Sequence, residues 1–168
     1  RCVDPSDGRA WDFDEPEMQR RALEKIRNEK PMFLVGSVMC TAFSSWQALN
    51  ATRRSGEVVE REKAKAKEHL KFAVSLYQEQ LDNDRYFVHE HPTGATSWQE
   101  QVIIDLQAAQ GIQKTTCDQC QYGAECQSGP GKGSPIKKPT SWLSNAPEIL
   151  KKMTRRCKGR AGACSRKK

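Results

Sequence analysis

The feature that most constrains the fold is the alternation of helical and strand patterns along the chain. A helix is predicted to begin near Asp14 and Pro16 and to end before Pro31. The apolar run MFLVGSV follows it, and such a run is typical of a strand buried on both faces. The further predicted elements are a helix over 57–81, a strand over 85–92, a helix from 97 closed by Gly111, strands over 112–117 and 139–145, and a last helix from 145.

This order predicts an α/β fold with a mostly parallel sheet and helices packed on its faces. In open sheets of this kind, ligands bind outside the carboxyl ends of the strands. Cys40 comes directly after the first predicted strand, and Glu90 lies near the end of the second. Although about fifty positions separate them, we expect these two side chains to share one crevice.

The composition fits a single domain with a thin core, because only 36% of the 168 residues are hydrophobic and the mean hydropathy is -0.80. No apolar run approaches the roughly 18 residues of a membrane span, and no secretory signal is recognisable. We therefore expect an intracellular protein, nuclear or cytoplasmic, with no membrane partner. The seven cysteines are an odd number, which favours reduced thiols or metal ligands over a disulfide framework.

The positive charge is concentrated at one end. From Gly131 onward there are 12 lysines and arginines and a single acid, Glu148. A block of this kind predicts a polyanionic partner, nucleic acid and most readily DNA, although a solvated basic tail has the same composition. The chain is accordingly divided into an α/β domain over 1–145 and a C-terminal helix with a basic, cysteine-containing tail over 146–168.

The cysteines outside the first strand raise the possibility of zinc. Cys117 and Cys120 have the spacing of a zinc half-site, and Cys126, Cys157 and Cys164 are further potential ligands. The last pair is spaced too widely for a regular zinc knuckle. Zinc ligands and ordinary thiols therefore both remain open.

Cys40 and Glu90 together suggest a chemistry. A thiolate is a strong nucleophile, and a nearby carboxylic acid can hydrogen-bond the ring that it attacks. Cytosine needs both, because its carbon 6 must be attacked and its nitrogen 3 must gain positive character before carbon 5 can accept a methyl group. Cys40 can equally be a buried hydrophobe and Glu90 a strand-end charge. The adjacent His89 and His91 are read as surface residues, or one of them as a metal ligand.

These segments resemble a known family. VGSVMCTAFSSW is similar to the strand-end segment of DNA cytosine-5 methyltransferases, in which Pro-Cys precedes a small residue and Phe-Ser, and YFVHEH resembles their next strand. The resemblance implies that Cys40 is the nucleophile and that Glu90 contacts nitrogen 3. It also implies that Thr41 and Ser44 line the pocket or contact the DNA backbone.

A third segment, CQYGAECQSGPGKGSPIKKPTSWLSN, resembles the later family segment in which Tyr-Gly precedes a basic stretch. Lys137 and Lys138 match that stretch, and Arg155 and Arg156 belong to the basic end that would hold DNA. Nearly the whole chain is similar to the methyltransferase-like segment of Copia-type retroelement polyproteins. The implied fold is a partial Rossmann-like, class I methyltransferase-like sheet.

The chain departs from the family in three places. Met39 replaces the proline before the cysteine, and His91 and Pro92 follow Glu90 where the family has Asn-Val. No Phe-x-Gly-x-Gly segment for S-adenosylmethionine is found, so we expect an N-terminally truncated domain with Asp12 as the best remaining cofactor contact. Two hypotheses follow: a DNA cytosine-5 methyltransferase-like enzyme, or a non-catalytic, basic nucleic-acid-binding remnant of a retrotransposon polyprotein, with or without a zinc brace.

Overall fold

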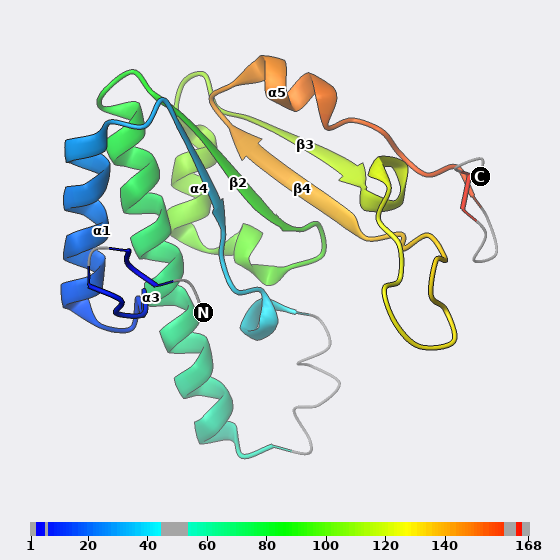
Figure 1. Ribbon diagram of the computed structural model, residues 1–168, viewed down its shortest axis with the longest axis horizontal. Coiled ribbons are helices and arrows are strands. Elements are labelled where there is room, and N and C mark those ends of the chain that lie inside the picture. The colour runs from blue at the N-terminus through cyan, green and yellow to red at the C-terminus, as the bar shows by residue number, and fades with distance from the viewer. Residues whose placement is uncertain (1–2, 6, 45–53, 160–163, 166–168) are drawn as a thin grey trace.

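The computed structural model describes residues 3–5, 7–44, 54–159 and 164–165, and its centre is an open four-stranded sheet (Figure 1). The strands lie close to their predicted positions. They are β1 (Phe33–Ser37), β2 (Tyr86–Pro92), β3 (Gln113–Asp118) and β4 (Pro139–Ser144). The helices are α1 (Pro16–Glu29), α3 (Gly56–Leu81), α4 (Gln101–Ala108) and α5 (Pro147–Lys152), with short 3-10 helices η1 (Thr41–Phe43), η3 (Thr96–Gln99) and η4 (Gln119–Tyr122).

The sheet is mixed, with the strand order β1-β2-β4-β3. β1 pairs with β2 in parallel, whereas β4 runs antiparallel to both of its neighbours. The prediction of a mostly parallel sheet therefore holds for the β1–β2 pair and is wrong for the pairs that involve β4. The reason is the connection from β3 to β4, which contains η4 and a Gly-rich loop but no α-helix that would carry the chain back along the sheet.

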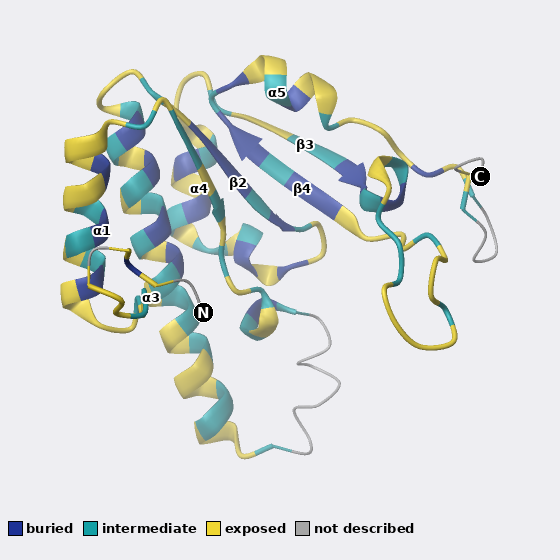
Figure 2. Ribbon diagram, viewed as in Figure 1, coloured by how far each residue is buried: buried dark blue, intermediate teal, exposed yellow. Residues whose placement is uncertain are grey.

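The core lies between the sheet and a layer of helices. Tyr77 of α3, Leu106 of α4, Phe87 of β2 and Leu143 of β4 form its main cluster. α3 packs against β1, β2 and α4, and α1 lies alongside α3 (Figure 1); Figure 2 shows the buried residues of these helices. α5 packs against β3 and β4. Of the helices that the structure describes, none has the length and apolar character to span a membrane.

The helix predictions hold for α1 and α3 and are wrong in detail for α4. Met18, Ala22 and Ile26 form the buried stripe of α1. Ser97, however, lies inside η3 and does not cap α4. Its hydroxyl instead forms a hydrogen bond with the Nδ1 atom of His91 in the core.

Gly36 marks the closest approach between the sheet and α3. The Tyr77 ring lies directly over it, stacked on Phe87 with 4.7 Å between the ring centroids. A Cβ atom at position 36 would lie 2.7 Å from Cζ of Tyr77, and closer still to its hydroxyl oxygen. The strand therefore requires glycine here because of packing, not because of an unusual backbone conformation.

Candidate site at the carboxyl edge of the sheet

The parallel pairing of β1 and β2 brings the two candidate catalytic segments to one edge. In the register of these strands, Ser37, the last residue of β1, lies opposite Glu90. Cys40 follows Ser37 by three residues, so the chain length alone keeps its Cα within about 10 Å of Ser37. The parallel pairing therefore brings the end of the strand that precedes Cys40 next to Glu90. That the two side chains share one crevice stays a prediction.

The Glu90 carboxylate is held on one side only. The Ser37 hydroxyl donates a hydrogen bond of 2.6 Å to its Oε2 atom. Its Oε1 atom is buried and has no hydrogen-bond partner among the described residues. A buried carboxyl oxygen without a hydrogen-bond partner is costly, so this atom needs a partner such as water or a bound polar group.

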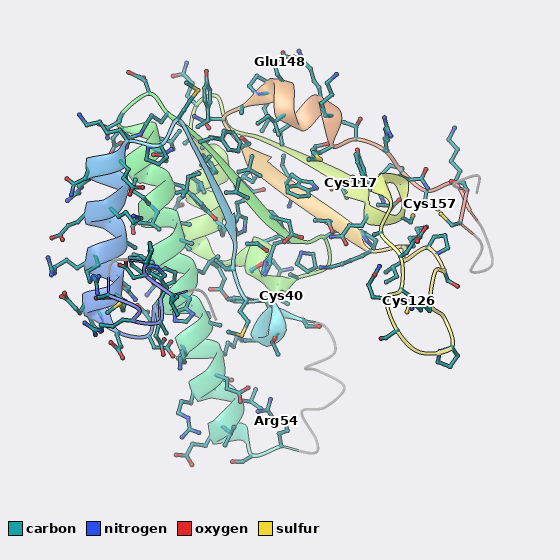
Figure 3. All side chains as sticks on the ribbon, in the orientation of Figure 1. Cys40, Arg54, Cys117, Cys126, Glu148 and Cys157 are labelled. Atoms are coloured by element: carbon teal, nitrogen blue, oxygen red, sulfur yellow. The ribbon has the colours of Figure 1, made fainter. Side chains whose placement is uncertain are left out.

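Cys40 lies between β1 and η1, immediately before the first residue of η1 (Figure 3). Its side chain is half-buried, and its carbonyl oxygen accepts a hydrogen bond from the amide of Phe43. Thr41 is exposed, and Ser44 is half-buried at the end of η1. Two surface hollows lie along α3, and neither is lined by Cys40 or Glu90.

His89 and His91 are both fully buried, so the prediction that they lie at the surface is wrong. The Tyr77 hydroxyl and the Nδ1 atom of His89 are 3.0 Å apart, and Trp98 packs edge-on against both histidine rings. Burial lowers the pKa of His89 to about 3 and that of His91 to about 4. Both imidazoles are therefore neutral near pH 7 and belong to the core.

The predicted basic residues lie at the same edge as Glu90. Lys137 and Lys138 are exposed and immediately precede β4, whose first residues pair with the end of β2. Arg155 and Arg156 are also exposed, and the carbonyl oxygen of Arg155 accepts a hydrogen bond from the amide of Asp118 at the end of β3. Positive charge therefore collects along the carboxyl ends of β2 and β3.

Asp118, which the sequence did not single out, fixes the chain around Cys157 to the end of β3. Its carboxylate accepts hydrogen bonds from the amide of Cys157 at 2.7 Å and from Nε of Arg156 at 3.1 Å. Tyr122 adds two contacts, donating its hydroxyl to the carbonyl of Lys152 and accepting the amide of Arg155. The polar Asp directly after a strand was the available signal, and its effect is to fix the first part of the basic tail to β3.

Three of the five predicted metal ligands come together. The sulfur atoms of Cys120, Cys157 and Cys164 all lie within 4.8 Å of one another and could hold a metal ion. Cys117 and Cys126 lie outside this group, so the half-site predicted from the Cys117–Cys120 spacing is wrong. Cys117 is the last but one residue of β3, and its sulfur accepts a hydrogen bond from the Trp142 indole.

Cys126 is turned into its own loop, where its thiol donates to the carbonyl oxygen of Ser128 (Figure 3). Within the three-cysteine group, backbone amides of Ser165 and Gly159 lower the pKa of Cys157, whereas burial raises the pKa of Cys120. The group therefore combines one thiol that ionises readily with one that is protected from solvent.

Asp12, the predicted cofactor contact, lies in the turn before α1. Its side chain is exposed, and its carboxylate accepts a hydrogen bond from the amide of Asp14, which closes the turn before α1. Its role as a contact for S-adenosylmethionine stays a prediction.

Comparison with known proteins gives no relative for this architecture: no protein-family model, no curated protein and no solved structure matches the chain at a significant level. Its class is therefore defined by the structure alone, a mixed α/β domain with a four-stranded open sheet.

Proposed function

We propose that this chain is a DNA cytosine-5 methyltransferase-like domain in which Cys40 and Glu90 form the base-attacking half of the site. The observation that carries the proposal is the buried Oε1 atom of Glu90, which has no hydrogen-bond partner among the described residues. Glu90 lies on β2, which pairs in parallel with β1, the strand that precedes Cys40. When the Glu90 carboxyl group carries a proton on this oxygen, it can donate a hydrogen bond to nitrogen 3 of a cytosine ring.

The strand order supports a partial Rossmann-like sheet as the scaffold. β1, β2 and β3 all run in the same direction, because β4 is antiparallel to both β2 and β3. Three like-directed strands in chain order correspond to one half of a doubly wound sheet, here with the reversed β4 inserted before the last of them. As part of this proposal, the domain belongs to a retroelement polyprotein in the nucleus or cytoplasm, which rests on the resemblance alone.

In the proposed chemistry, the Cys40 thiolate adds to carbon 6 of a cytosine that has been turned out of the duplex. The electron pair of the 5,6 double bond moves to carbon 5, which becomes nucleophilic. The Glu90 carboxylic acid donates a hydrogen bond to nitrogen 3 and favours this addition, while Ser37 keeps the carboxyl group in place through its Oε2 atom.

A covalent trap tests the proposal without any cofactor. In DNA that contains 5-azacytosine, addition of Cys40 to carbon 6 sends the electron pair to nitrogen 5, which takes a proton from water. We expect a protein–DNA adduct that survives denaturing electrophoresis. Cys40→Ala should abolish it, and Glu90→Gln should slow its formation by roughly 10²-fold or more, the usual range for a lost acid.

Cys126→Ala is the matched control, because Cys126 is another half-buried cysteine and lies in a separate loop. The adduct should form at an unchanged rate in this variant. An adduct that persists in Cys40→Ala, or the absence of any adduct from a chain that binds the same DNA, would refute the nucleophile.

The basic edge gives an independent prediction on DNA binding. Neutralising Lys137 and Lys138 together (Lys→Gln) should reduce the slope of log affinity against log salt by about 2, one unit for each lost phosphate contact. The measurement is fluorescence anisotropy of a labelled duplex across a salt series. Replacing Lys25 and Lys71 in the same way, two exposed residues of α1 and α3, should leave the slope unchanged. Equal effects from the two pairs would mean that charge alone, not this edge, binds DNA.

The second candidate function is a non-catalytic nucleic-acid-binding domain. The docking of Arg155 and Arg156 on the end of β3 favours it, because a fixed basic segment binds phosphates without any chemistry. Salt-sensitive binding with no adduct would select this alternative.

A further inference from the structure

The three clustered cysteines come from segments far apart in the sequence. Cys120 lies in η4, directly after β3, whereas Cys157 and Cys164 lie beyond α5. Cys120 is fully buried and Cys157 nearly so. The sulfur atoms of Cys157 and Cys164 are 3.7 Å apart. Two thiolates on one tetrahedral zinc, each at about 2.3 Å, lie about 3.8 Å apart, so this spacing fits a shared metal ion as well as a thiol–thiol contact.

The surroundings of the sulfur atoms are also those of metal-bound thiolates. The Ser165 amide and hydroxyl both point at the sulfur of Cys157, at 3.4 and 3.6 Å. The side-chain amide of Gln121 lies 3.6 Å from the sulfur of Cys120 and 3.5 Å from that of Cys164. Donors of this kind neutralise part of the charge on ligating sulfurs and orient them.

Asp118 positions Cys157 through a hydrogen bond to its backbone. Its Oδ2 atom accepts the amide of Cys157, which sets the backbone at that cysteine. The neighbouring Arg155, Arg156 and Lys158 are all exposed cations. Zn²⁺ with three thiolates keeps one net negative charge, and these cations offset it.

We propose that Cys120, Cys157 and Cys164 bind one zinc ion, with water as the fourth ligand, and that the ion clamps the basic tail to the end of β3. The clamp would hold Arg155 and Arg156 beside Lys137 and Lys138 as one surface. The site itself stands without the proposed methyltransferase chemistry, because it uses neither Cys40 nor Glu90.

The competing possibility is a disulfide between Cys157 and Cys164, for which the present separation would have to shorten to about 2.05 Å. A disulfide would use only two of the three clustered cysteines and would give the buried Cys120 no role in the cluster. Metal uptake by the fully reduced chain therefore separates the two.

The experiment is a titration of the reduced, metal-free chain with Co²⁺, followed by displacement with Zn²⁺. We expect one ion per chain, with the thiolate-to-cobalt charge-transfer band and intense visible bands of a tetrahedral site. Cys164→Ser, at a half-buried position near the end of the chain, should weaken binding by at least about 100-fold. Cys120→Ser should do the same if circular dichroism shows that it folds.

Cys126→Ser is the control, and it should keep full affinity because its sulfur faces Ser128. No stoichiometric uptake, or uptake that Cys126→Ser weakens as much as Cys164→Ser does, would overturn the proposal. Metal stoichiometry tests the zinc site, whereas the Cys40 adduct tests the proposed function. A negative result in one experiment therefore does not decide the other.

Discussion

Replacing Gly36 with alanine is expected to destabilise the domain by roughly 3 kcal/mol or more, at the upper end of the range for overpacking a core. The added Cβ would overlap the Tyr77 ring, at 2.7 Å from Cζ. The ring cannot easily move away, because it is stacked on Phe87 and its hydroxyl is hydrogen-bonded to His89. Chemical denaturation followed by far-UV circular dichroism measures the loss.

A double-mutant cycle assigns this loss to the contact between residues 36 and 77. Tyr77→Phe alone should destabilise the domain by about 1 kcal/mol or more, because it leaves His89 without its partner. In the Gly36→Ala background the same change should instead stabilise it, since it removes the atom nearest to the new methyl group. Gly94→Ala, at an exposed glycine with nothing within 4 Å of the added Cβ, should change stability by no more than about 0.5 kcal/mol. Equal losses at both glycines would refute the steric explanation.

Lowering the pH from 7 to 5 is expected to cost the fold roughly 3 to 4 kcal/mol, a large part of a typical domain's stability. In the unfolded chain His89 and His91 bind protons near pH 6.5, whereas burial lowers their folded-state pKa values to about 3 and about 4. The unfolded state therefore binds more protons below pH 6.5, so stability is complete above that pH and is lost as the pH falls toward 4. Urea unfolding at a series of pH values measures the slope.

The contributions of His89 and His91 to the pH dependence of stability can be measured separately. His91→Asn removes one ionisable group and should reduce the loss between pH 7 and 5 by about half. Carboxylates contribute little in this window, since their ordinary pKa values lie near 4. If stability stayed constant from pH 7 to pH 5, the two imidazoles would have to be solvated in the native state.

Local patterns in the sequence determined the elements and the outline of the site. The apolar run before Cys40, the helix-start signals at Asp14 and Pro16, and the short stretch that ends in polar residues around Glu90 predicted β1, α1 and β2 at nearly their observed positions. They could do so because strand and helix periodicities depend on near neighbours. The parallel pairing of β1 and β2, in which Ser37 lies opposite Glu90, also agrees with the predicted alternation of helices and strands.

Tertiary structure alone decided which distant residues meet. The spacing of Cys117 and Cys120 favoured a half-site, yet β3 ends between them, so that Cys117 faces Trp142 and only Cys120 meets Cys157 and Cys164. His89 and His91 look polar in sequence but lie on the strand face that α3 and α4 cover. The reversal of β4 likewise depended on a connection without a helix. Sequence carries short-range periodicity, whereas these outcomes depend on which strand face is covered and on where the chain returns to the sheet.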